Sequence, residues 1–82
     1  MKRYRTRGTC AREIQFDVTE DGRVTGVRFA GGCPGNAQGV ARLVEGMRTE
    51  EVIARLRGID CAGRGTSCPD QLARALEQET GR

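Results

Sequence analysis

Hydrophobic and polar residues alternate with period two along the first third of the chain. The apolar positions of this pattern are Ile14, Phe16, Val18, Val27 and Phe29. Such alternation is typical of half-buried β-strands. The polar break at residues 19–23 contains Asp-Gly, a dipeptide that favours the positive φ of a tight turn. Residues 12–30 are therefore predicted to form a β-hairpin, and residues 4–7 are a candidate edge strand beside it.

From residue 36 onward, the spacing of apolar residues changes to that of a helix. The first helical stripe consists of Ala37, Val40, Val44 and Met47. It predicts a helix of about three turns that ends near Gly46. A second, short helix is predicted from Thr49, as its N-cap, to Gly58, because Glu50 and Glu51 place negative charge at its positive end.

A third helix is predicted to begin at residues 67–70, where Pro69 stands just inside the start. Its apolar face consists of Leu72, Ala73, Ala75 and Leu76, and residues 77–82 are expected to fray. The predicted fold class is α+β: a β-hairpin, or a three-stranded antiparallel sheet if residues 4–7 pair with it, packed by three helices. We expect one domain over residues 1–82, with residues 1–8 as a basic N-terminal arm or the edge strand.

The composition limits both the core and the available chemistry. The chain has 82 residues, and its Leu, Ile, Val and Phe total only 15. A domain of this size hides only about 60% of its unfolded surface, so we expect a metal or a cross-link to support the fold. The absence of histidine excludes Ser-His-Asp and Cys-His nucleophile pairs and the H-E-x-x-H zinc proteases.

Positive charge is concentrated at the start of the chain. Lys2, Arg3, Arg5, Arg7 and Arg12 all precede the first acidic residue. This arm could meet phosphates or an acidic partner, or could simply be a solubilising edge. Three aromatic residues are too few for a base-stacking platform, so a nucleic-acid partner is not expected.

The sequence also contains no apolar run that resembles a secretory signal or a membrane span. A cytoplasmic location is therefore expected, with no membrane partner. In that compartment thiols are kept reduced, and a set of four cysteines is more often a metal site than a disulfide framework.

All four cysteines fall at predicted element boundaries. Cys10 precedes the first hairpin strand, Cys33 follows the second, Cys61 lies in a glycine-containing loop and Cys68 opens the last helix. The two ends of a hairpin lie together, so Cys10 and Cys33 can be close in space. A helix N-terminus stabilises a thiolate, the form that binds metal. The four cysteines are therefore candidate ligands of zinc or, second, of an iron-sulfur cluster.

Two other interpretations of the cysteines stay open, because their spacing lacks the C-x-x-C pairs of zinc ribbons. They could be scattered structural thiols of a metal-free interaction domain, or a reversible disulfide could join Cys68 to Cys33 or to Cys61. Asp70 is interpreted as a partner of the helix dipole, with a role as an exchangeable ligand as the alternative. No residue is assigned a catalytic role.

The motif at residues 66–70 reads TSCPD, which is the signature of the TSCPD-domain family. The segments GGCPGN at 31–36 and LVEGM at 43–47 also resemble small stand-alone members of that family, and the resemblance extends from Gly8 to Leu76. In the family, this domain also occurs at the C-terminus of adenosylcobalamin-dependent ribonucleoside-diphosphate reductases. Stand-alone members are often labelled as reductases for that reason.

The resemblance implies an accessory module rather than the reductase activity, since 82 residues cannot hold the barrel, radical cysteine and nucleotide sites of that enzyme. It also implies a protein partner, either a ribonucleotide reductase or an iron-sulfur or redox protein. A homodimer is compatible with so small a core.

A more distant similarity is to iron-sulfur scaffold proteins of the IscU/NifU N-terminal type. Cys10, Cys33 and Cys68 align with the three cluster cysteines of the scaffold. This chain departs from the scaffold by having Arg12 in place of its aspartate and Ser67 in place of its histidine. The similarity implies an IscU/NifU-like fold, in which Cys61 would supply the fourth ligand of a stable, all-thiolate site.

Overall fold

Three strands are followed by three helices in the computed structural model, which describes residues 2–7, 11–31, 34–60, 63 and 65–80. The elements are β1 (Lys2–Arg5), β2 (Ala11–Val18), β3 (Val24–Gly31), α1 (Pro34–Val44), α2 (Thr49–Leu56) and α3 (Cys68–Thr80). The strands form one antiparallel sheet in the order β1-β2-β3. The predicted α+β class, with three strands and three helices, is confirmed.

The hairpin turn forms where the Asp-Gly dipeptide predicted it. Gly22 has a φ of +81°, and its N–H donates to the Thr19 carbonyl at 3.0 Å. The Thr19 N–H in turn donates to the Arg23 carbonyl at 2.8 Å. The edge strand is also present, but β1 begins and ends two residues before the predicted range, with Tyr4 opposite Ile14 of β2.

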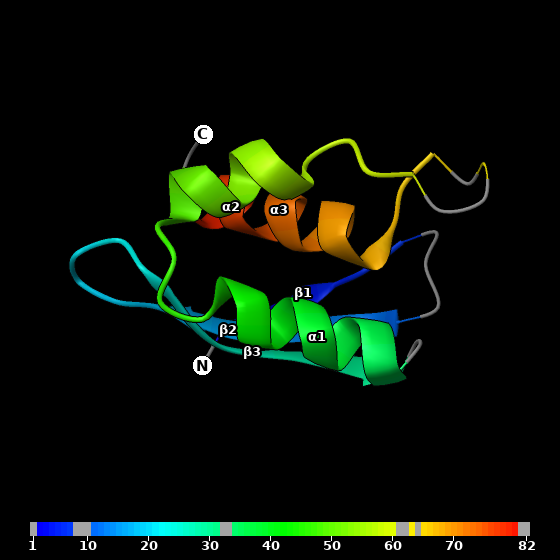
Figure 1. Ribbon diagram of the computed structural model, residues 1–82, viewed down its shortest axis with the longest axis horizontal. Coiled ribbons are helices and arrows are strands. Elements are labelled where there is room, and N and C mark those ends of the chain that lie inside the picture. The colour runs from blue at the N-terminus through cyan, green and yellow to red at the C-terminus, as the bar shows by residue number, and fades with distance from the viewer. Residues whose placement is uncertain (1, 8–10, 32–33, 61–62, 64, 81–82) are drawn as a thin grey trace.

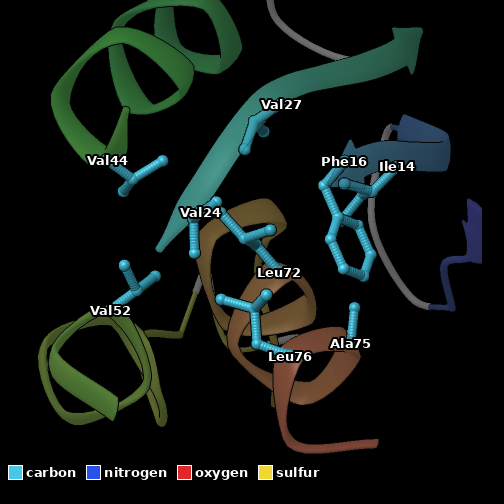
Figure 2. Close-up of a cluster of buried hydrophobic side chains, with 9 residues drawn as sticks. All are labelled: Ile14, Phe16, Val24, Val27, Val44, Val52, Leu72, Ala75 and Leu76. Atoms are coloured by element: carbon cyan, nitrogen blue, oxygen red, sulfur yellow. The ribbon is translucent and has the colours of Figure 1, made fainter. Parts of the chain in front are cut away.

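The hydrophobic core lies between one face of the sheet and the helices. Figure 2 shows side chains from β2, β3 and all three helices converging there. The core cluster consists of Ile14, Phe16, Val24, Val27, Val44, Val52, Leu72, Ala75 and Leu76. Helix α1 packs against β3, and α2 packs against α3 (Figure 1). Burial of each large apolar side chain contributes about 1.5–3 kcal/mol, and α3 supplies two of the fully buried ones, Leu72 and Leu76.

The start of α2 differs from the prediction. Thr49 is the first helical residue and not the N-cap, which is Arg48, without a side-chain cap. The Thr49 hydroxyl donates to Glu50 Oε2 at 3.1 Å, and its N–H donates to the Gly22 carbonyl at 3.0 Å. The hairpin turn therefore holds the residue that sequence reasoning assigned to the cap. The expected acidic first turn, with Glu50 and Glu51, is confirmed.

The last helix is longer than predicted, because contacts with other elements hold its final turns. Residues 77–80 remain helical instead of fraying. Glu77 accepts a hydrogen bond from Arg57 at 2.7 Å, and Glu79 pairs with Lys2 of β1 at 2.8 Å. The polar sequence of residues 77–82 predicted a frayed tail, but Glu77 and Glu79 lie on α3 and bind other elements. Within the described residues, no helix has the length and apolar character that a membrane crossing needs.

Candidate functional site

The TSCPD motif forms the start of α3, and its serine caps that helix. The Ser67 hydroxyl oxygen accepts a hydrogen bond from the Asp70 N–H at 3.1 Å, and the Ser67 carbonyl accepts one from the Gln71 N–H at 2.8 Å. Pro69 sits in the first turn, where a missing N–H costs nothing. Cys68 is thereby fixed as the first helical residue, with a partly exposed, free thiol.

Asp70 is fully buried and accepts hydrogen bonds on both carboxylate oxygens. Its Oδ1 accepts from the Gly58 N–H at 2.6 Å and lies 3.5 Å from Arg57 Nη1. Its Oδ2 accepts from the Thr66 hydroxyl at 2.5 Å and from Arg74 Nε at 2.7 Å. The carboxylate therefore fastens the end of α2 to the start of α3. Asp70 therefore does more than interact with the helix dipole, and its alternative role as an exchangeable metal ligand stays a prediction.

Two effects act in opposite directions on the ionisation of Asp70. Burial raises the pKa of this carboxyl, since it disfavours the charged form. Hydrogen bonds from Thr66, Gly58 and Arg74 outweigh burial and hold the pKa below its ordinary value. The carboxylate is therefore charged at neutral pH, and Arg57 and Arg74 balance that charge close to Cys68.

A second set of hydrogen bonds joins the motif to the end of the N-terminal segment. Gln71 Nε2 donates to the Thr66 hydroxyl oxygen at 2.9 Å, and Gln71 Oε1 accepts from the Arg7 N–H at 3.1 Å. Gln71 and Thr66 are both buried. This hydrogen bond joins Arg7, three residues before Cys10, to Gln71, three residues after Cys68.

The loop before the motif is organised by Asp60. This carboxylate accepts hydrogen bonds from the Gly63 N–H at 2.7 Å and from the Gly65 N–H. Both glycines have a positive φ, of +78° and +81°. Asp60 is therefore a turn-forming residue in the segment that contains position 61.

Of the four candidate metal ligands, only Cys68 lies within the described residues. Cys10, Cys33 and Cys61 lie outside them. Within residues 2–7, 11–31, 34–60, 63 and 65–80, no group of three or more cysteine or acidic side chains could hold a metal ion. The described neighbours of the four positions are nevertheless located toward one end of the molecule: the starts of β2, α1 and α3, the end of β3 and the Asp60 loop (Figure 1).

Sequence reasoning located the motif but missed the network behind it. Three signals were readable: serine three residues before an acid at a helix start, threonine one residue earlier, and arginine four residues after Asp70. The contacts of Asp70 with Arg57 and Gly58 could not be read, because they depend on how α2 packs against α3.

Comparisons with known proteins agree with the motif. A family model described as TSCPD domain matches residues 2–80, which is nearly the whole chain. No match is found among curated proteins or among solved structures. The similarity to the IscU/NifU type stays a prediction.

Proposed function

The chain belongs to the TSCPD-domain family, and we propose that it is a four-cysteine metal-binding accessory module. The proposed ligands are Cys10, Cys33, Cys61 and Cys68, and the preferred metal is zinc, with an iron-sulfur cluster second. The observation that carries the proposal is the construction around Cys68. Buried polar residues of the motif fix the start of α3, while the thiol itself stays partly exposed.

The donor set fits a metal that prefers sulfur. The chain has no histidine, and the carboxylate of the motif, Asp70, is engaged by four donors. Thiolates are thus the available soft ligands near this helix start. Arg57 and Arg74 offset the negative charge of Asp70, which reduces the repulsion that a thiolate at Cys68 would meet.

Chain connectivity supports the participation of the other three cysteines. Cys10 is bonded directly to Ala11, Cys33 to Pro34 and Cys61 to Asp60. Ala11 pairs with Gly31 across the sheet, so the start of β2 and the end of β3 are adjacent. The hydrogen bond between Arg7 and Gln71 brings the segment before Cys10 to α3. A bound metal would supply on the order of 10 kcal/mol of folding free energy, which compensates for a small core.

The test is the metal and sulfide content of protein purified without oxygen, measured per chain together with a visible absorption spectrum. We expect about one zinc per chain, or iron with acid-labile sulfide, in the wild type and in a Thr9→Ser control. Each of the four Cys→Ser variants should lose metal. Wild-type protein that holds neither zinc nor iron, and whose four thiols all react without denaturant, would contradict the proposal.

A thiol-disulfide accessory is the second candidate, and the free, partly exposed thiol of Cys68 favours it. In this function Cys61 or Cys33 would join Cys68 in a reversible disulfide. Oxidation should then remove two thiols per chain, and reduction should restore them, with no metal released. A metal site predicts the opposite behaviour, because thiols bound to a metal are protected until the metal leaves.

The family resemblance gives the class of partner for either function. We propose a ribonucleotide reductase, or an iron-sulfur or redox protein, with this chain as accessory and not as the enzyme. The measurement is retention of such a reductase from the same cell on the immobilised wild-type chain. Retention by wild type and loss with a Cys68→Ser variant would support this partner, and equal recovery on an unrelated bait would refute it.

A further inference from the structure

A groove of about 580 Å³ lies between β3 and α1, away from the Asp70 network. One wall comes from α1, and the other follows residues 27–31 of β3. Its lining residues are Val27, Arg28, Phe29, Gly31, Ala37, Gln38, Ala41 and Arg42. The groove therefore combines an apolar floor with two cationic side chains. Its volume falls in the range of about 300–1,000 Å³ that is usual for binding sites.

The outer edge of β3 borders this groove. In the sheet order β1-β2-β3, β3 has a strand neighbour on one side within the described part of the chain. A sheet edge of this kind offers backbone N–H and C=O groups to an incoming strand. Five residues, 27–31, span roughly 14 Å between their outermost Cα atoms, which suits about five residues of an extended peptide.

The protein already uses the first half of this edge in the same manner. The segment after α1 runs along the start of β3, where the Gly46 N–H donates to the Val24 carbonyl and the Val24 N–H donates to the Met47 carbonyl, both at 2.8 Å. Next to them, the Glu45 carboxylate accepts from the Gly26 N–H at 3.0 Å and from the Thr25 hydroxyl at 2.6 Å. Backbone groups and a carboxylate therefore both form hydrogen bonds with this edge, and the groove begins at the next residue, Val27.

The positive charge of the groove favours an acidic partner. Arg28 and Arg42 are exposed, and neither forms an ion pair with a described residue. The lining contains no Asp or Glu. A peptide paired with β3 would direct alternate side chains to opposite faces, so one set would meet the floor at Phe29 and Ala41, beside Arg42, and the other set would lie on the face of Arg28.

We infer that this groove binds an extended, acidic peptide segment of a partner protein, which adds as a strand to the outer edge of β3. The affinity would come from backbone pairing with residues 27–31 and the specificity from alternating apolar and acidic side chains. This surface is separate from the proposed cysteine site. Its test therefore does not depend on the metal content of the protein.

The test uses fluorescence anisotropy with the dye-labelled peptide Val-Glu-Val-Glu-Val and the full chain. We expect saturable binding, weakened roughly tenfold or more in an Arg28→Glu/Arg42→Glu variant because like charges then face each other. An Arg3→Glu/Arg55→Glu variant makes the same change in net charge away from the groove and should bind as the wild type does. Circular dichroism spectra should match for all three proteins.

Three controls separate strand addition from other causes. A peptide with the same side chains but methylated at every internal backbone nitrogen lacks those backbone donors and should bind roughly tenfold more weakly or not at all. Equal binding of that peptide, of Val-Lys-Val-Lys-Val or of a thymidine oligonucleotide would overturn the inference. So would a chain that is dimeric by analytical ultracentrifugation and becomes monomeric in the Arg28→Glu/Arg42→Glu variant, since a second copy would then occupy the edge.

Discussion

Replacement of Asp70 by asparagine tests whether the TSCPD motif is primarily a structural joint. The substitution keeps the shape of the side chain but removes the charge and replaces one acceptor oxygen by an NH₂ group. In the folded protein, both oxygens of Asp70 accept hydrogen bonds, and the side chain is fully buried. The new NH₂ group must therefore face a donor, whichever way the amide is turned.

The magnitude follows from the contacts that are lost. A hydrogen bond to a charged group contributes about 1.5–3 kcal/mol, and removal of one member of a buried charge pair costs about 3–5 kcal/mol. Arg57 and Arg74 are 41% and 40% exposed, so water screens part of their interaction with Asp70. We expect Asp70→Asn to lower the free energy of unfolding by about 2–4 kcal/mol. This is a large share of the roughly 4–12 kcal/mol usual for 82 residues.

The assay is urea unfolding at pH 7, followed by far-ultraviolet circular dichroism at matched metal content. With a slope of about 1 kcal/mol per M, the midpoint should fall by roughly 2–4 M. Asp21→Asn is the matched control, because Asp21 is an exposed turn carboxylate that pairs with Thr19 and Arg23. It should move the midpoint much less. Equal shifts in the two variants, or no shift in Asp70→Asn, would refute the structural reasoning.

The same pair of proteins predicts a pH dependence. The folded-state pKa of Asp70 lies below its value in the unfolded chain, which is about 3.9. The unfolded state therefore binds the proton more readily, and the stability from Asp70 is present above about pH 4 and lost as the pH falls through the folded pKa. The gap in stability between wild type and Asp70→Asn should be constant from about pH 5 to 7 and shrink below about pH 4. A gap that widens in acid would mean that the pKa is raised.

Three further predictions concern the core, a glycine and the β3 edge. Leu72→Ala should lower the free energy of unfolding by about 2–5 kcal/mol in the same urea assay, because Leu72 is fully buried. Leu43→Ala, at a site 78% exposed, should change it by less than about 0.5 kcal/mol. Similar losses in the two variants would contradict the core assignment. Gly58→Ala should cost about 1–2 kcal/mol because Gly58 has a φ of +92°, and an unchanged urea midpoint would show that this conformation is not required. In an NMR titration, the pKa of Glu45 should lie below its ordinary value, held down by the Thr25 hydroxyl and the Gly26 N–H, and Thr25→Val should raise it; no change would remove the hydroxyl from that role.

The elements that the sequence predicted correctly are those set by local pattern. The hairpin follows from alternation and one Asp-Gly turn, and the start of α3 follows from a capping serine and a proline. The predictions were wrong where the position of a residue depends on contacts with a distant part of the chain. Thr49 is held by the Gly22 carbonyl and not by its own helix, and Glu79 is held by Lys2. The pattern of neighbouring residues cannot predict these partners, because they are far away in the sequence.

The five residues of the motif divide between support and chemistry. Thr66 binds Asp70, Ser67 caps the helix, Pro69 occupies the turn that needs no N–H, and Asp70 joins α2 to α3. Cys68 is the member whose thiol, within the described part of the chain, takes no part in these contacts. A side chain that only filled space would tolerate other small residues, and a motif built to hold one thiol would not. Cys68→Ala should therefore remove the ligand that the thiol provides without removing any hydrogen bond of Asp70.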